Sequence, residues 1–95
     1  MSAADRFALE AAWTLSAAVA LRPERFGALS YHFGTRRLSF LKSPRLLEVV
    51  QELSRQPSAR AACDAVGITV DERPTIDAAL ARLASTEFIV RRDAP

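Results

Sequence analysis

Hydrophobic and polar residues alternate most regularly between Gly27 and Lys42, in the stretch GALSYHFGTRRLSFLK. Gly34-Thr35 divides it, and Gly at the first central position of a two-residue turn is typical of a type II′ β-hairpin. The alternation then predicts a single register for strands at residues 27–33 and 36–42. The apolar face pairs Phe33 with Arg36, Tyr31 with Leu38, and Leu29 with Phe40, whereas the polar face pairs His32 with Arg37 and Ser30 with Ser39.

The segment before this hairpin alternates as well. Trp13 and Leu15 begin the pattern, and Val19, Leu21 and Pro23 continue it. Proline has no backbone N–H, so the strand should end near Pro23 or lie at a sheet edge. Together with the hairpin, this strand predicts a three-stranded antiparallel meander.

After the hairpin the apolar period changes from two residues to that of a helix. Ser43 followed by Pro44 is typical of a helix start, because the Ser hydroxyl accepts a hydrogen bond from a free amide and Pro suits the first helical position. Ser58 starts a second helix in the same way, and Gly67 ends it. The apolar positions of the three predicted helices are Leu46, Val49, Val50 and Leu53; Ala59, Ala62, Cys63 and Val66; and Ile76, Ala79, Leu80 and Leu83.

The third helix should begin near Asp71 and Glu72, because acidic side chains favour a helix N-terminus, and end near Ser85. In the connector before it, Ile68 and Val70 are expected to fill the core. Residues 88–90 form a last apolar segment.

This order of elements predicts an α+β fold, a three-stranded antiparallel meander followed by three helices, with winged helix-turn-helix-like character. We expect a single domain over residues 13–91. Residues 1–12 form an Ala-rich N-terminal segment, and the pattern leaves open whether it is helical or frayed.

The composition narrows the classes of protein that this chain can represent. Its 95 residues suffice for one core, and its single cysteine excludes an internal disulfide, which favours a reducing, cytoplasmic location. One His and one Cys cannot build a usual zinc site, so neither a metal nor a cofactor is expected. The apolar run at residues 11–20 lacks the cationic start of a signal peptide and is too short to span a bilayer.

Signals of enzymatic chemistry are absent from the sequence. It has no Gly-rich phosphate loop, no HExxH and no GxSxG motif. His32 falls on the polar face of the hairpin without a catalytic partner, so we interpret it as a solvated strand histidine. Cys63 lies on the apolar side of the second helix and is interpreted as a small buried hydrophobe. The sequence therefore predicts a protein that is not an enzyme.

Binding to DNA is the alternative function, because a winged helix-turn-helix can place a helix in the major groove. The third predicted helix offers few base-reading side chains beyond Arg73 and Arg82. Its acidic start would repel phosphates, and a net charge of +2 is small for nucleic-acid binding. Nucleic acid is therefore not the expected partner.

The outer edge of the strand at residues 36–42 has no predicted neighbour. A two-residue hairpin closed by Phe33 and Arg36 would direct the backbone groups of Arg37, Ser39 and Leu41 outward. Such an edge is either protected or used by an extended peptide that adds a strand. Surrounding Arg and Lys residues would favour an acidic peptide.

The stretch VALRPERFGALSYHFGTRRLSFLKSPRL, residues 19–46, resembles the mycofactocin-system peptide chaperones, which belong with the peptide chaperones of the pyrroloquinoline-quinone type, and the resemblance is dense from Val19 to Leu47. The resemblance continues collinearly, in weaker form, to about Val90. Two departures from the family pattern are Arg25, where proline is common, and Ser30, where leucine is common. They lie in a turn and on the predicted polar face.

The resemblance implies a non-catalytic chaperone that binds the leader of a ribosomal precursor peptide. It would deliver that peptide to a radical S-adenosylmethionine (SAM) maturase, which modifies the C-terminal Val-Tyr of the precursor and carries the iron–sulfur clusters. The family fold adds the leader beside the third strand, against the third helix. The peptide-binding residues that this implies are Arg37, Leu38, Ser39, Phe40, Leu41, Ile76, Ala79, Leu80, Arg82 and Leu83. Leu38, Phe40, Ile76 and Leu80 are also expected in the core.

Overall fold

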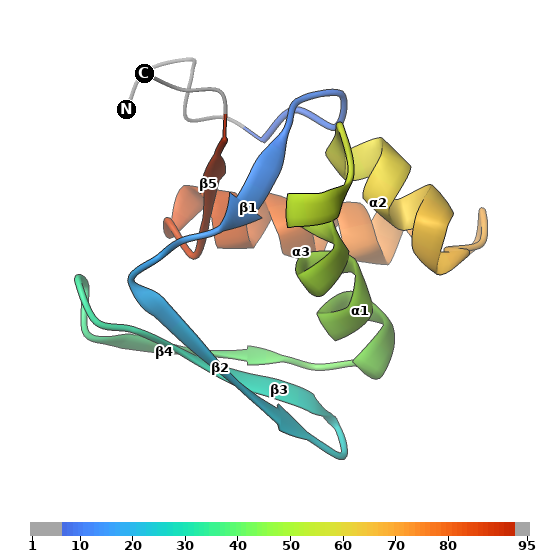
Figure 1. Cartoon of the computed structure of the whole chain (residues 1–95). Coiled ribbons are helices and arrows are strands. Elements are labelled where there is room, and N and C mark those ends of the chain that lie inside the picture. The colour runs from blue at the N-terminus through green and yellow to red at the C-terminus, as the bar shows by residue number, and fades with distance from the viewer. Residues whose placement is uncertain (1–6, 93–95) are drawn as a thin grey trace.

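The computed structural model describes residues 7–92 of the chain. Two antiparallel sheets and three α-helices make up the fold (Figure 1). The elements are β1 (Trp13–Leu15), β2 (Val19–Glu24), β3 (Gly27–His32), β4 (Arg37–Leu41), α1 (Pro44–Glu52) with a 3-10 turn (Leu53–Arg55), α2 (Ala59–Val66), α3 (Arg73–Ser85) and β5 (Ile89–Arg91). The predicted α+β class is confirmed.

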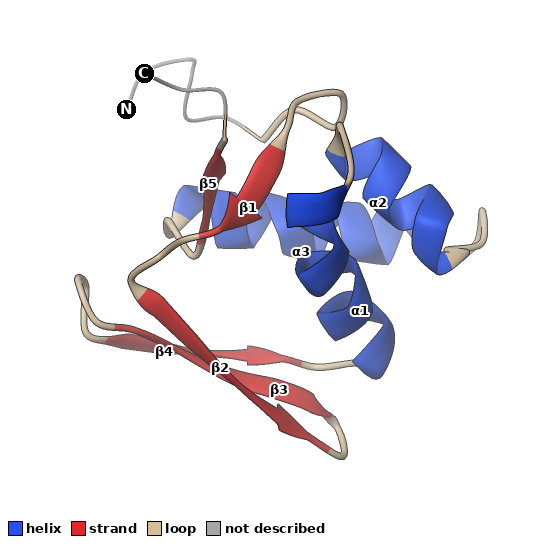
Figure 2. Cartoon of the chain, in the orientation of Figure 1, coloured by secondary structure: helices blue, strands red, loops and turns tan. Residues whose placement is uncertain are grey.

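The larger sheet has the strand order β2-β3-β4, and all three helices lie on one side of it (Figure 2). Its hairpin register is the predicted one, with Leu29 facing Phe40 and Tyr31 facing Leu38. Pro23 lies on the edge strand β2, as its missing N–H requires. The predicted three-stranded meander is therefore confirmed.

The turn that joins β3 to β4 is wider than predicted. The last facing pair is His32 with Arg37, and the Arg36 amide donates to the His32 carbonyl at 2.7 Å. Gly34 is not in the positive-φ region, whereas Arg36 has φ 60°. The prediction of a two-residue type II′ turn was therefore wrong, because residues 33–36 form a loop between the strands.

His32 holds this loop and is not solvated as predicted. Its Nδ1 accepts the amides of Gly34 and Thr35 at 3.0 and 3.2 Å. The ring proton then resides on Nε2, which donates to the Glu87 carbonyl at 3.1 Å. The imidazole is 6% exposed and meets the Phe88 ring edge-on at a centroid distance of 5.3 Å. His32 thus joins the hairpin loop to the segment before β5.

The sheet buries its more polar face, although hydrophobicity alone would favour burial of the apolar face. Ser30 and His32 are buried toward the helices, whereas Leu38 and Phe40 are 59% and 57% exposed. The expectation that Leu38 and Phe40 belong to the core was therefore wrong. The two polar side chains can be buried because each has hydrogen-bond partners. The Ser30 hydroxyl donates to the Ser39 carbonyl, and the His32 ring bonds to Gly34, Thr35 and Glu87.

The first predicted strand divides into two. The Ser16 carbonyl accepts from the Val19 amide at 3.0 Å, and this turn separates β1 from β2. β1 pairs with β5, with Trp13 facing Arg91 and Leu15 facing Ile89. The last apolar segment thus completes a second, two-stranded sheet, which single-strand periodicity did not predict.

The helix boundaries follow the predicted caps. Ser43 and Ser58 accept amide hydrogen bonds at the starts of α1 and α2, and Gly67 ends α2 with φ 83°. In the turn that precedes α3, the Thr69 hydroxyl and the Glu72 carboxylate accept each other's amide protons in the reciprocal pattern of a capping box, which the sequence analysis missed. Val70 is 86% exposed, so its predicted place in the core was wrong, whereas Ile68 is buried as predicted.

The core joins both sheets to the helices. Its largest fully buried side chains include Trp13, Phe88, Leu41 and Leu53, and Cys63 is buried as predicted. Within the N-terminal segment, residues 1–6 lie outside the described part, while the Ala8 carbonyl accepts the Trp13 indole N–H at 2.9 Å. Among the described residues, no helix has the length and apolar character needed to cross a membrane.

Replacing His32 by alanine tests the role of the imidazole in this fold. We expect His32→Ala to lower the free energy of unfolding by about 2 to 3 kcal/mol, because buried hydrogen bonds and ring packing are lost together. Urea denaturation measures this change. Arg37→Ala, at the exposed facing position, is the control and should change stability by less than about 0.5 kcal/mol. Equal stability of the two variants would contradict the assigned role.

Candidate functional site

The free edge of β4 directs the backbone groups of Leu38 and Phe40 outward. Three hydrogen bonds fix this alternation: Phe33 N–H to Ala18 carbonyl, Arg36 N–H to His32 carbonyl, and Ser30 hydroxyl to Ser39 carbonyl. Even-numbered residues of β3 therefore face β4, and their partners on β4 are odd-numbered. The prediction that Arg37, Ser39 and Leu41 direct their backbone groups outward was wrong, because the wider loop shifts the closing pair by one residue.

The opposite edge of the same sheet, on β2, is poorly suited to receive a strand. The outward positions there are Val19, Leu21 and Pro23, by the same alternation. The Val19 amide already donates to Ser16, and Pro23 has no amide to donate. The edge of β4 contains no proline, and among the strands that the structure describes β4 pairs only with β3, so it is the sheet's open template.

A groove runs between β4 and α3 beside this open edge. It contains a larger cavity of about 480 Å³ and a smaller one of about 120 Å³. Phe40, Leu46, Ala79 and Arg82 line both cavities, so the two are neighbouring parts of one groove. The larger cavity extends toward the starts of α1 and α3, whereas the smaller one extends toward the C-terminal end of α3.

The structure brings most of the predicted site residues to this groove. The six that line its cavities are Ser39, Phe40, Ile76, Ala79, Arg82 and Leu83. Leu41 and Leu80 are 1% and 0% exposed and belong to the core beneath the groove. Arg37 and Leu38 are exposed on β4 outside the cavities. Of the ten predicted residues, six thus line the groove, two lie in the core beneath it, and two are exposed on β4 outside it.

Several lining residues were not predicted from the sequence. They include Lys42 and Leu46, on either side of the β4–α1 junction, and Thr75 and Ala78 on α3. The signal for the last two was present, since Ala78 is one helical turn from Thr75 and Arg82. The prediction took the apolar stripe of α3 and Arg82, so the other polar and small positions beside that stripe were left out.

The groove has the chemistry of a binding site. Its cations are Lys42 and Arg82, and neither cavity is lined by an acidic residue. Among residues 7–92, no group of three or more His, Cys, Asp or Glu side chains could hold a metal ion. Burial raises the pKa of the Cys63 thiol, which keeps it protonated and unreactive. An apolar, cationic groove beside an open strand is suited to an extended, acidic peptide.

One ion pair fixes the far end of the groove. The Arg45 guanidinium on α1 donates two hydrogen bonds of 3.1 Å to the Glu72 carboxylate before α3, and Arg45 also donates to the Gly67 carbonyl at 2.7 Å. The Arg45 hydrogen bonds, together with the Thr69 amide, lower the pKa of Glu72 to about 2. This pair holds the first turns of α1 and α3, which line the larger cavity, at a set separation.

Comparison with known proteins identifies the family of this chain. The sequence profile of the "Peptide chaperone MftB family" matches residues 12–90. A "Peptide chaperone MftB" from Mycobacterium ulcerans is 46% identical over 91 residues, which is 96% of this chain and 84% of the relative. That from Mycobacterium tuberculosis is 49% identical over 81 residues, covering 84% of this chain and 73% of the relative. No solved structure matches the chain significantly.

The Arg45–Glu72 pair predicts a pH-dependent stability. Because the folded-state pKa of Glu72 is about 2 against a usual 4.5, its contribution is present above about pH 4.5 and is lost as the pH falls toward 2. We expect Glu72→Gln to lower the melting temperature at pH 7, and the difference from the wild type to narrow below pH 4. Thermal unfolding followed by circular dichroism between pH 7 and pH 2.5 measures both curves.

The neighbouring variant Asp71→Asn is the control, because Asp71 is exposed and precedes the same helix. Its melting curves should follow those of the wild type. A difference between Glu72→Gln and the wild type that stays constant down to pH 2.5 would contradict the role of this pair.

Proposed function

The chain belongs to the MftB family of peptide chaperones, and from this premise we propose how it handles its peptide. It binds the leader of a ribosomal precursor peptide by adding it as a strand to β4, and it presents the peptide to a radical SAM maturase of mycofactocin biosynthesis. The family assignment makes the protein a chaperone and not an enzyme. The open edge of β4 above a cationic, apolar groove is the observation that carries the proposal.

The added strand would be held first by backbone hydrogen bonds. Leu38 and Phe40 each offer one free N–H and one free carbonyl along the edge, since their neighbours on β4 are used by β3. Such bonds do not depend on the side chains of the guest, so they provide affinity for many sequences. Selection among peptides then falls to the groove.

The groove reads alternate side chains of the guest. Side chains that lie level with one another on neighbouring strands project to the same face of a sheet. A guest residue level with Ser39 therefore projects toward the smaller cavity of about 120 Å³. A guest residue level with Leu41 projects toward the larger cavity of about 480 Å³. The leader should carry a smaller and a bulky apolar residue two positions apart.

Electrostatics favour an acidic leader. Lys42 and Arg82 line the groove, and Arg36 and Arg37 lie exposed where the hairpin ends. Exposed cations accelerate the encounter with an acidic peptide and are screened by salt. Since backbone bonds and apolar burial provide the main affinity, added salt should weaken binding only in part.

In this proposal the protein works in the cytoplasm, where precursor peptides leave the ribosome. It contributes no cofactor of its own. The redox chemistry belongs to the maturase, and the chaperone's part is to fix the leader in an extended form. An extended leader loses its conformational freedom before it reaches the enzyme, so the enzyme does not have to order it.

Proline substitution tests the strand addition directly. We expect Leu38→Pro to weaken leader binding at least about tenfold, because proline removes an outward N–H and leaves the ladder with β3 intact. Leu38→Ala, which keeps the amide, should bind within about threefold of the wild type. Isothermal titration with a synthetic peptide copying the leader measures both, and duplex DNA serves as the negative ligand.

Ser39→Pro provides the opposite test on the next residue. Its amide faces β3, so proline there should lower the melting temperature of the domain itself. If Ser39→Pro abolished binding in a fully stable domain, while Leu38→Pro bound normally, the assigned alternation of β4 would be wrong.

A second substitution tests the groove. Ala78 is exposed and lines the larger cavity, so Ala78→Phe should fill that cavity and weaken leader binding about tenfold. Ala81→Phe is the matched control, because Ala81 is exposed on α3 but lines neither cavity. Both variants should keep the wild-type melting temperature. Equal binding by the two variants would show that the leader does not use this groove.

A further inference from the structure

The face of the β2-β3-β4 sheet that points away from the helices carries an apolar patch. We call it the outer face, and its residues are Phe26, Leu29, Tyr31, Phe33, Leu38 and Phe40. Phe33, Leu38, Phe40 and Phe26 are 63%, 59%, 57% and 45% exposed, respectively. The inner face of the same strands meanwhile holds the buried polar residues Ser30 and His32. Hydrophobic burial within this domain does not account for such a distribution, whereas contact with another protein does.

The aromatic side chains of the outer face are already arranged in pairs. Tyr31 and Phe33 meet edge-on at a centroid distance of 5.0 Å, and Phe26 and Phe40 are 6.1 Å apart. Aromatic side chains that are held by neighbours lose little freedom when a partner covers them. This is the kind of surface on which protein interfaces concentrate their binding energy.

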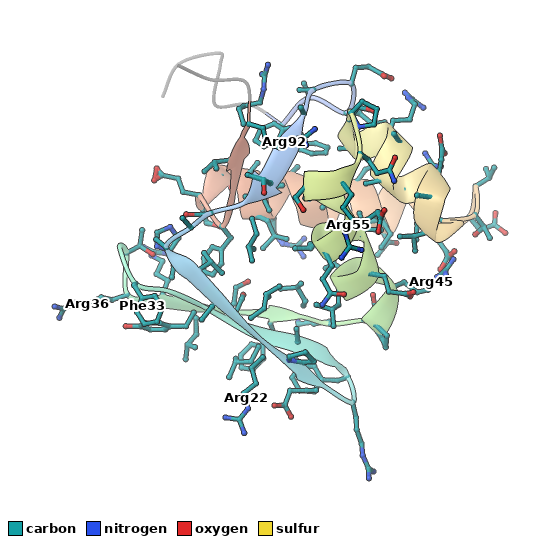
Figure 3. The ribbon with its side chains drawn as sticks, viewed as in Figure 1. Arg22, Phe33, Arg36, Arg45, Arg55 and Arg92 are labelled. Carbon is teal, nitrogen blue, oxygen red and sulfur yellow. The ribbon has the colours of Figure 1, made fainter. Side chains whose placement is uncertain are left out.

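The charges around the outer face indicate the kind of partner. Arg22 projects from the sheet away from the helices, and Arg36 projects from the hairpin tip (Figure 3). Arg22 is paired with Glu24 at 3.0 Å, so the excess positive charge around the outer face comes from Arg36 and from Arg25, which is exposed in the β2–β3 turn. A second copy would bring like charges together, so the favoured partner has an apolar centre surrounded by carboxylates.

The outer face is continuous with the proposed peptide site. Phe40 lines both cavities of the groove and also packs against Phe26 on the outer face. A strand added to β4 would place its side chains level with Leu38 and Phe40 on this same face. The bound leader therefore enlarges the outer face with alternate side chains of its own.

We propose that the outer face, completed by these outward side chains of the bound leader, is the surface on which the maturase docks. This inference rests on the proposed function, and it adds which surface meets the enzyme and why binding depends on the peptide. Because part of the surface is supplied by the leader, the enzyme binds the loaded chaperone more tightly than the empty one. By reciprocity, the enzyme tightens the chaperone's hold on the leader by the same factor.

The test measures the affinity of the purified maturase for the full-length chaperone, with and without a saturating synthetic leader. Phe33→Ser should weaken the enzyme complex about tenfold in both titrations, since an exposed aromatic anchor is removed. Val70→Ser is the matched control, because Val70 is also exposed but lies in the connection between α2 and α3. It should bind as the wild type does.

A second pair of variants tests the charge at the rim. Arg36→Asn removes a cation and keeps a residue type that tolerates the positive φ at this position. It should slow association with the maturase and flatten its dependence on salt. Arg55→Gln, at an exposed position in the 3-10 turn (Leu53–Arg55), should do neither.

Three outcomes would overturn the inference: equal affinity of the Phe33→Ser and Val70→Ser variants for the enzyme, no enzyme binding by the wild type, or a dimer through the outer face at the concentrations used.

Leader binding by Phe33→Ser is measured separately and should match that of the wild type, because Phe33 lines neither cavity. If the leader fails to bind the wild type, strand addition fails. Enzyme binding to the empty chaperone still decides whether this face docks the enzyme.

Discussion

The buried imidazole of His32 is the constraint on which the site depends. Its Nδ1 takes the amides of Gly34 and Thr35, and its Nε2 donates to the carbonyl of Glu87. These bonds favour a loop over residues 33–36 in place of a tight turn, and the loop makes His32 and Arg37 the closing pair. The length of the loop therefore sets which backbone groups of β4 are left without a partner.

The same ring joins the hairpin to the rest of the domain. Glu87 lies between α3 and β5, so the bond from His32 ties the loop before β4 to the helix that forms the opposite wall of the groove. The Arg45–Glu72 pair connects α1 to the start of α3 at the other end. The groove is thus held at both ends by polar contacts, while its middle rests on Leu41 and Leu80 in the core.

This arrangement leaves room for the two binding surfaces that we propose for this small domain. In the proposed function, the edge of β4 and its groove would provide main-chain bonds and apolar cavities for an extended guest. The outer face carries aromatic side chains that lie outside the buried core. Placing Ser30 and His32 in the interior is what leaves Tyr31, Phe33 and Phe40 available outside. The buried side chains of Ser30 and His32 both have hydrogen-bond partners, so burying the polar face leaves neither of them unsatisfied.

Local sequence chemistry was enough to locate much of the fold. Ser43-Pro44, Ser58 and Gly67 gave the helix ends, and alternation gave the hairpin register, because caps and side-chain period act within a few residues of one another. The apolar stripe of α3 was also predicted, and the family resemblance implied that Ile76 and Ala79 of this stripe form a wall of the groove, where the structure has them. The family resemblance was confirmed by comparison across most of the chain.

What the sequence by itself determined was the three helices, the order and register of the β2-β3-β4 meander, and the family. The tertiary structure alone decided which face of the sheet is buried, which residues of β4 have free backbone groups, and that β1 joins β5. Those features depend on contacts between residues far apart in the chain, above all His32 with Glu87. A period of two residues is satisfied equally well by either face, so only the distant partner that satisfies a buried polar group selects between them.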